Sequence, residues 1–212
     1  IRDRSPSRGL GDVYKRQVYA YIMIFAFIHE LGHLITGLIV GMKPEKIEIM
    51  PFGVSISFKI NPKEYNLKIK KANKLEIKKI IVALAGPLTN FLIILIAGNL
   101  KIDIFKSLII IYTNFLIMIF NLLPIYPLDG GRVLNGILYI IFGKRKAEKY
   151  TNIISKIAVA TITIISSIAV LYIHNIAIIL IDIYLWYLII KEDTKYNKRQ
   201  EIYKKLLENN TI

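Results

Sequence analysis

The feature that most constrains the fold is a nearly continuous apolar run from Val18 to Met42, which is long enough to cross a bilayer as a helix. Similar runs recur along the chain, and 54% of its 212 residues are hydrophobic. Lipid offers no hydrogen-bond partners to the backbone, so we expect every such run to be helical. The sequence predicts an all-α polytopic membrane protein with about five transmembrane helices. The expected spans are at about 18–42, 80–100, 107–123 continuing through a break to 143, 157–173 and 177–190.

The first apolar run contains His29-Glu30-Leu31-Gly32-His33. Two imidazoles and a carboxylate are costly in hydrocarbon, which indicates a functional role. Residues four apart lie on one face of a helix, so His29 and His33 can bind one Zn²⁺ while Glu30 stands beside the metal. The chain has no Cys, so a bound zinc would use nitrogen and oxygen ligands. The alternative is a pair of histidines that only packs two helices together.

A later apolar run is interrupted between Asn121 and Gly131 by two prolines and a pair of glycines, which break a helix. Irregular backbone at membrane depth is tolerated where it is buried in protein or lines a wet cavity. Asp129 lies in this break and is a candidate third ligand, since catalytic zinc usually keeps three protein ligands and one open position. The alternative is a turn at the membrane interface with a solvated Asp129.

The two segments together resemble the paired signatures of the site-2 protease family of intramembrane zinc metalloproteases. Met50-Pro51-Phe52-Gly53 and Ala85-Gly86-Pro87-Leu88 agree with this resemblance, which covers about residues 18–190. It is most like the branch that contains stage IV sporulation protein FB.

This resemblance implies roles for five residues. His29, His33 and Asp129 would hold the zinc, and Glu30 would be the general base. Asn121 occupies the family's asparagine position, which we expect to lie near the substrate.

The resemblance also implies the function, a zinc-dependent intramembrane endopeptidase that performs regulated proteolysis of a transmembrane or membrane-tethered protein. The branch implies that the substrate is a pro-sigma factor in sporulation and that inhibitory membrane proteins are partners. The broader family also cleaves anti-sigma factors and signal-peptide remnants. A membrane metal-ion transporter is one alternative, although it should show repeated halves with matched ligands. A catalytically inactive membrane scaffold is the other, and the presence of Glu30 and all three ligands disfavours it.

The net charge of +14 raises the question of nucleic acid, but no nucleic-acid module is visible. The Lys and Arg residues cluster in the connections 43–79 and 144–156 and in the tail from residue 191. By the positive-inside rule these segments face the cytoplasm, and the sparse connections 101–106 and 174–175 face away. We therefore expect a multi-pass membrane protein with its active site toward the cytoplasmic side. The resemblance implies that this membrane is that of a bacterial cell.

Three parts of the chain differ in composition. Residues 1–17 are basic against the positive-inside rule and rich in Ser, Gly and Arg, so we interpret them as a foreign or truncated head and expect the native first span to be missing. Residues 18–190 form the intramembrane metalloprotease core. Residues 191–212 form a charged cytoplasmic tail, either a short amphipathic helix or a solvated segment.

Residues 46–49 and 54–58 alternate apolar and polar side chains around Pro51 and Gly53, which predicts a short β-hairpin after the zinc-binding helix. A helical substrate must be unwound before it is cut, and strand addition at the hairpin's edge would hold it extended. The alternative is a plain hairpin that covers the site. Elsewhere, Asp182 is interpreted as a helix-pairing or orienting residue and His174 as an interfacial one.

Overall fold

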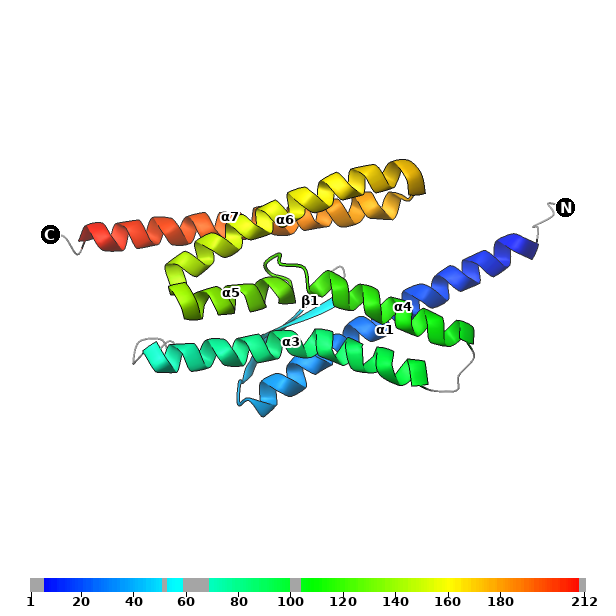
Figure 1. The fold of residues 1–212 in the computed structure, drawn as a ribbon, viewed down its shortest axis with the longest axis horizontal. Coiled ribbons are helices and arrows are strands. Elements are labelled where there is room, and N and C mark those ends of the chain that lie inside the picture. The colour runs from blue at the N-terminus through cyan, green and yellow to red at the C-terminus, as the bar shows by residue number, and fades with distance from the viewer. Residues whose placement is uncertain (1–5, 51–52, 59–68, 100–103, 210–212) are drawn as a thin grey trace. The chain divides into compact units, whose positions relative to one another are not determined.

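The computed structural model describes residues 6–50, 53–58, 69–99 and 104–209 (Figure 1). Six helices and two strands make up this part of the chain: α1 Pro6–Ile39, β1 Pro44–Met50, β2 Gly53–Phe58, α3 Ile69–Asn99, α4 Ile104–Asn121, α5 Asp129–Phe142, α6 Lys144–Ile173 and α7 Ile176–Asn209. They form two compact units. The first contains Ile1–Ala72 and Ile81–Asn121, and the second contains Asn73–Ile80 and Leu122–Ile212.

Within the described residues, three helical segments are long and apolar enough to cross a membrane: Val18–Ile39, Ala72–Asn99 and Lys144–Ile173. They correspond to the first, second and fourth expected spans. The apolar segment Ser107–Asn121 is helical but shorter, and residues 177–190 are helical within α7. Many large apolar side chains on these helices are exposed, as lipid-facing residues are, including Ile164, Leu171 and Tyr172.

The helix that carries the histidines ends in a glycine motif. Gly41 has a φ of 77°, and its N–H donates to Leu38 O over 3.0 Å. The N–H of Met42 donates to Gly37 O over 2.8 Å. This pair of bonds is the Schellman arrangement, which needs a left-handed residue that glycine adopts without steric cost. The chain therefore leaves α1 sharply and enters β1.

β1 and β2 pair as an antiparallel hairpin in the register Ile47 to Ile56 and Met50 to Gly53. The hairpin lies against α1, where the ring of Phe58 packs on Gly37 so closely that any side chain at Gly37 would overlap it. The predicted turn residue Pro51 lies outside the described residues.

Small residues bring α1 and α3 into close contact in the first unit. A Cβ at Gly32 would overlap the hydroxyl of Thr89 and lie 3.1 Å from Ala85 O. Close approach through Gly and Ala is how helices associate in lipid, where no hydrophobic drive acts between them. α3 continues through Pro87, and α4 is tied to it by the hydroxyl of Ser107, which donates to Ala97 O over 2.8 Å.

The second unit contains the predicted break, which runs from residue 122 to residue 128. Backbone groups freed by the break are satisfied by α6, because Ser155 Oγ accepts from Tyr126 N over 3.0 Å and donates to Pro124 O over 3.3 Å. A Cβ at Gly130 would overlap Leu122 O, and one at Gly131 would overlap the Ile125 backbone. The double glycine thus lets α5 start directly against the break.

α6 and α7 pair around Asp182. Thr163 Oγ1 donates to Asp182 Oδ1 over 2.9 Å, and Trp186 Nε1 donates to Thr163 Oγ1 over 2.9 Å. The helix-pairing role predicted for Asp182 is confirmed. The two helices are joined at His174, which has a left-handed φ of 51°, and Asn175, whose side chain accepts from Ala177 N over 3.0 Å.

Two basic segments are helical: one was expected to be a connection between spans, and the other was expected to be the tail. Residues 144–156 begin α6, and α7 continues from residue 191 to Asn209. The described part of the tail is therefore helical, as one of its two alternatives predicted, and this helix is continuous with the last apolar segment. The extension packs on α6, where Asp193 binds Lys156 over 2.6 Å and Asn152 over 2.8 Å. Lys and Glu favour helices and neither segment contains Gly or Pro, so helix formation continues through both.

The other basic connection, 43–79, is partly helical as well, because α3 already begins at Ile69. Residues 6–17 of the predicted head belong to α1. Parts of three predicted segments lie outside the described residues: residues 1–5 of the head, residues 101–103 of the connection 101–106, and residues 210–212 of the tail.

Candidate metal centre

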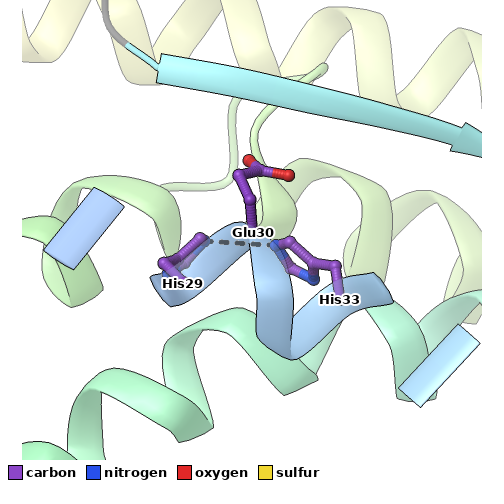
Figure 2. A group of neighbouring side chains, drawn as sticks. All are labelled: His29, Glu30 and His33. Carbon is purple, nitrogen blue, oxygen red and sulfur yellow. Dashed lines mark hydrogen bonds between the residues drawn. The ribbon is translucent and has the colours of Figure 1, made fainter. Parts of the chain in front are cut away.

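The two histidines of the first apolar helix converge as their spacing predicts. His29 and His33 are 3% and 4% exposed, and their Nε2 atoms lie 3.2 Å apart. Glu30 completes a group whose ligand atoms all lie within 4.8 Å of one another. Figure 2 shows both rings on one side of α1 and Glu30 beside them, with its carboxylate toward a strand of the hairpin.

The protonation of His33 follows from its partner. Its Nδ1 lies 2.7 Å from Val82 O, a backbone carbonyl on α3 that can only accept, so Nδ1 donates. A neutral ring then carries its lone pair on Nε2. His29 Nδ1 has a corresponding contact of 2.5 Å with Oδ1 of Asn90, also on α3. Both rings therefore direct their Nε2 atoms to one point.

This geometry fits zinc. Two unprotonated nitrogens facing each other repel unless a cation lies between them. Two nitrogens at about 2.0–2.1 Å from a tetrahedral zinc are about 3.3 Å apart, close to the spacing of the two Nε2 atoms. Carbonyl partners on the other ring nitrogens are the usual support of zinc-binding imidazoles. His29 and His33 thus have the geometry of a pair of zinc ligands, which disfavours the helix-packing alternative.

Gly86 on α3 leaves room for the Nε2 side of the two rings. A Cβ built at this residue would lie 2.5 Å from His29 Nε2 and would overlap the His33 ring. The Gly86 segment therefore packs beside the helix that carries the histidines, and this close approach explains the need for glycine.

Asp129 was predicted as a site residue from the break, and Asn121 from the resemblance. Asp129 is the first residue of α5 in the second unit, is 4% exposed and has Oδ1 3.9 Å from Arg132 Nη1. Its burial contradicts the alternative of a solvated aspartate. Asn121 is the last residue of α4 in the first unit, and its Nδ2 donates to Ile117 O over 3.0 Å. The structure brings together His29, Glu30 and His33, and it describes Asp129 only with its own unit.

Residues that support the site were missed in the sequence. Asn90 and Asn114 are both 0% exposed and join His29 through hydrogen bonds. The available signal was an amide side chain inside each of two apolar runs, where polar groups are costly. Their partners, and the role of the Val82 carbonyl, depend on how three helices pack and cannot be read from one segment.

Comparisons with known proteins agree with this centre. The model of peptidase family M50 matches residues 17–102 and 99–165. A zinc metalloprotease of Methanocaldococcus jannaschii is 30% identical over 185 residues, which are 84% of this chain and 49% of that protein. Stage IV sporulation protein FB of Bacillus subtilis is 26% identical over 128 residues, 58% of this chain and 40% of that protein. The chain thus spans about half the length, or less, of these relatives.

The solved site-2 protease from Methanocaldococcus jannaschii is similar in fold. Its TM-score is 0.55 at 26% sequence identity, over 82% of this chain and 76% of that one. The comparisons support the wider family and do not single out the sporulation branch, because the archaeal relative is at least as similar as the sporulation protein.

Proposed function

The chain belongs to peptidase family M50, and from this membership we propose that it is a zinc-dependent intramembrane endopeptidase. The observation that carries the proposal is the pair of buried Nε2 atoms, 3.2 Å apart, on a helix apolar enough to span a membrane. The carboxylate of Glu30 beside them adds the group that peptide hydrolysis needs.

The chemistry divides between the metal and Glu30. When bound, zinc supplies an acidified water and polarises the peptide carbonyl. The carboxylate of Glu30 takes the proton from the attacking water and returns it to the leaving amine. His29 and His33 would hold the metal, and their rings are held in turn through their Nδ1 atoms.

Asp129 is our proposed third ligand. It is a buried carboxylate at the start of a helix, directly after the irregular segment 122–128. An aspartate oxygen completes the nitrogen and oxygen set that a chain without Cys can offer. Asn121, at the end of α4 before the same break, is proposed to contact the substrate.

The substrate class follows from where the site lies. A catalytic pair inside a membrane-spanning helix can act on a transmembrane or membrane-tethered protein, and we propose this class. Within this class, the most specific proposal is that the substrate is a pro-sigma factor of sporulation and that inhibitory membrane proteins are partners. It is supported by the 26% identity with stage IV sporulation protein FB. The hairpin against α1 is proposed to hold the unwound substrate by strand addition.

We further propose that five segments cross the membrane of a bacterial cell, with the site toward the cytoplasm. The support for this orientation is the concentration of Lys and Arg near residues 43–79, 144–156 and 191–209. A metal-ion transporter is disfavoured, since His29, Glu30 and His33 form the single candidate ligand group among the residues described, without a matched second group.

Cleavage by the full chain in liposomes tests the proposal. The substrates are a panel of fluorescent reporter proteins, each tethered by a different single transmembrane segment. We expect the wild type to cut at least one reporter and Glu30→Gln to cut none while zinc content stays the same. Glu201→Gln, which changes an exposed glutamate on α7, is the matched control and should cut like the wild type. Equal cleavage by Glu30→Gln and the wild type would refute the proposal, and zinc transport into the liposomes would favour the transporter.

A further inference from the structure

Three consecutive hydrogen bonds run from His29 through two buried asparagines to a backbone carbonyl. His29 Nδ1 lies 2.5 Å from Asn90 Oδ1 on α3. Asn90 Nδ2 donates to Asn114 Oδ1 on α4 over 2.9 Å, and Asn114 Nδ2 donates to Ile110 O over 2.9 Å. Both asparagines are 0% exposed. We call Asn90 and Asn114 the amide relay.

The direction of the relay is fixed at its far end. Ile110 O can only accept, so the NH₂ group of Asn114 must face it. The oxygen of Asn114 then faces Asn90 and requires the NH₂ group of that residue. This leaves the oxygen of Asn90 toward His29, so Nδ1 of His29 must carry the proton and Nε2 must carry the lone pair.

We infer that Asn90 and Asn114 are positioning residues that set the tautomer and ring orientation of the zinc ligand His29 from the backbone of α4. His33 needs no such relay, because its Nδ1 donates directly to Val82 O. The inference deepens the proposed function and rests on it, since it assigns the support of the same metal pair.

A simpler role for the two amides is to hold α3 and α4 together, as polar side chains do in membrane bundles. The two roles differ in what a conservative change does. Asn90→Asp keeps an oxygen toward His29 but has no donor for Asn114, so it preserves the tautomer and weakens the contact between helices. Asn90→Leu removes both the oxygen that faces His29 and the donor that binds Asn114. Asn114→Leu leaves the Asn90 amide able to turn either end toward His29.

The first measurement is zinc affinity of the full chain in detergent, by competition with a chromophoric chelator. Loss of a hydrogen-bond partner behind a zinc ligand typically lowers metal affinity by about 10–100-fold, and we expect this loss for Asn90→Leu. Asn114→Leu should bind more weakly than the wild type, and Asn90→Asp should bind within a few-fold of it. Thr113→Val changes the buried neighbour of Asn114 on α4 and is the control for disturbance of the bundle.

The second measurement does not depend on zinc or on cleavage. The chain has only three histidines, so the ring nitrogens can be followed by ¹⁵N NMR of metal-free protein at about pH 8. His174→Gln removes the ring that lies outside the site. We expect the Nδ1–H tautomer at His29 in the wild type and in Asn90→Asp, and a mixture in Asn90→Leu.

The outcomes separate this inference from the proposed function. If Asn90→Leu keeps the tautomer and binds zinc as tightly as Thr113→Val, the relay is only a helix contact and the inference is overturned, while the protease proposal stands. If the wild type binds no zinc, the protease proposal fails, and the tautomer spectra alone decide whether the relay orients His29.

Discussion

A Cβ placed on Gly86 would lie 2.5 Å from Nε2 of His29, so the backbone of α3 passes directly beside the nitrogen that faces His33. The neighbouring helix thereby forms one wall of the candidate metal centre. Close approach of this kind needs glycine and makes the wall sensitive to a single methyl group.

Gly86→Ala should therefore lower zinc affinity by at least about 10-fold, because the methyl group pushes both imidazoles away from their common point. Overpacking of this kind typically costs about 1–3 kcal/mol of stability as well. Chelator competition and thermal unfolding measure the two effects. Gly98→Ala is the matched control on the same helix, since a Cβ there has open space around it. Equal zinc affinity in the two variants would mean that Gly86 does not bound the metal centre.

Removing Asp129 tests the proposed third ligand. We expect Asp129→Ala to weaken zinc binding by more than the roughly 10–100-fold typical of residues behind the ligands, because a ligand itself is lost. Asp182→Asn is the control, since Asp182 is also a carboxylate in an apolar helix but pairs with Thr163. The idea fails if Asp129→Ala and Asp182→Asn bind zinc equally well.

The sequence predicted the part of the site that lies on one helix. His29, Glu30 and His33 are set by a four-residue spacing that any regular helix converts into a shared face, so their meeting needs no tertiary information. Asn90 and Asn114 lie on two other helices, and their contact depends on the relative rotation and height of α3 and α4. Apolar periodicity says nothing about that relation in lipid, where helices can be apolar on all sides.

The hairpin's proposed role in substrate binding predicts a defect that spares the metal. Ser57→Pro, or Ser55→Pro, removes a backbone donor from β2. Cleavage of a tethered reporter should then fall sharply, while zinc content stays at the wild-type level because neither residue belongs to the metal group. Zinc content and cleavage are measured on the same preparation. Unchanged cleavage would argue that the hairpin only covers the site.

The part of α7 that follows the apolar segment, from residue 191 onward, should be less stably packed on α6 at acidic pH. The Lys156 ammonium, followed by the Asn152 amide, lowers the pKa of Asp193 below its ordinary value of 3.8. A lowered folded pKa means that the carboxylate stabilises the folded pair above the unfolded pKa, and that this contribution disappears as the pH falls through the folded value. Hydrogen exchange of the amides in residues 191–199 should therefore accelerate below about pH 3.8.

Asp193→Asn is the comparison for this effect. It should exchange faster than the wild type at neutral pH and should lose the acid-dependent step. An acid-dependent step of the same size in both proteins would assign the effect to other carboxylates. The contribution is modest, because 28% of the Asp193 side chain and 46% of the Lys156 side chain are exposed.

The same contacts explain why the sequence alone did not decide between a helical and a solvated tail. Apolar periodicity ends near Ile190, and the Lys-rich segment that follows resembles a solvated tail. Its helix is supported instead by Asp193 with Lys156 and by Arg199 with Glu148, pairs that join α7 to the equally charged start of α6. Such pairing joins residues 37 and 51 positions apart in the sequence. Neither charged segment, taken alone, predicts a contact with the other.

The most direct test of the central claim is the zinc environment of the purified full chain, measured by metal analysis and X-ray absorption. We predict about one zinc per chain, with nitrogen and oxygen neighbours at about 2.0–2.2 Å, including two imidazoles, and no sulfur. Glu30→Gln should keep this spectrum, whereas His33→Ala should lose most of the metal. A wild-type chain that binds no zinc, or a His33→Ala variant with an unchanged zinc spectrum, would contradict the metal centre on α1.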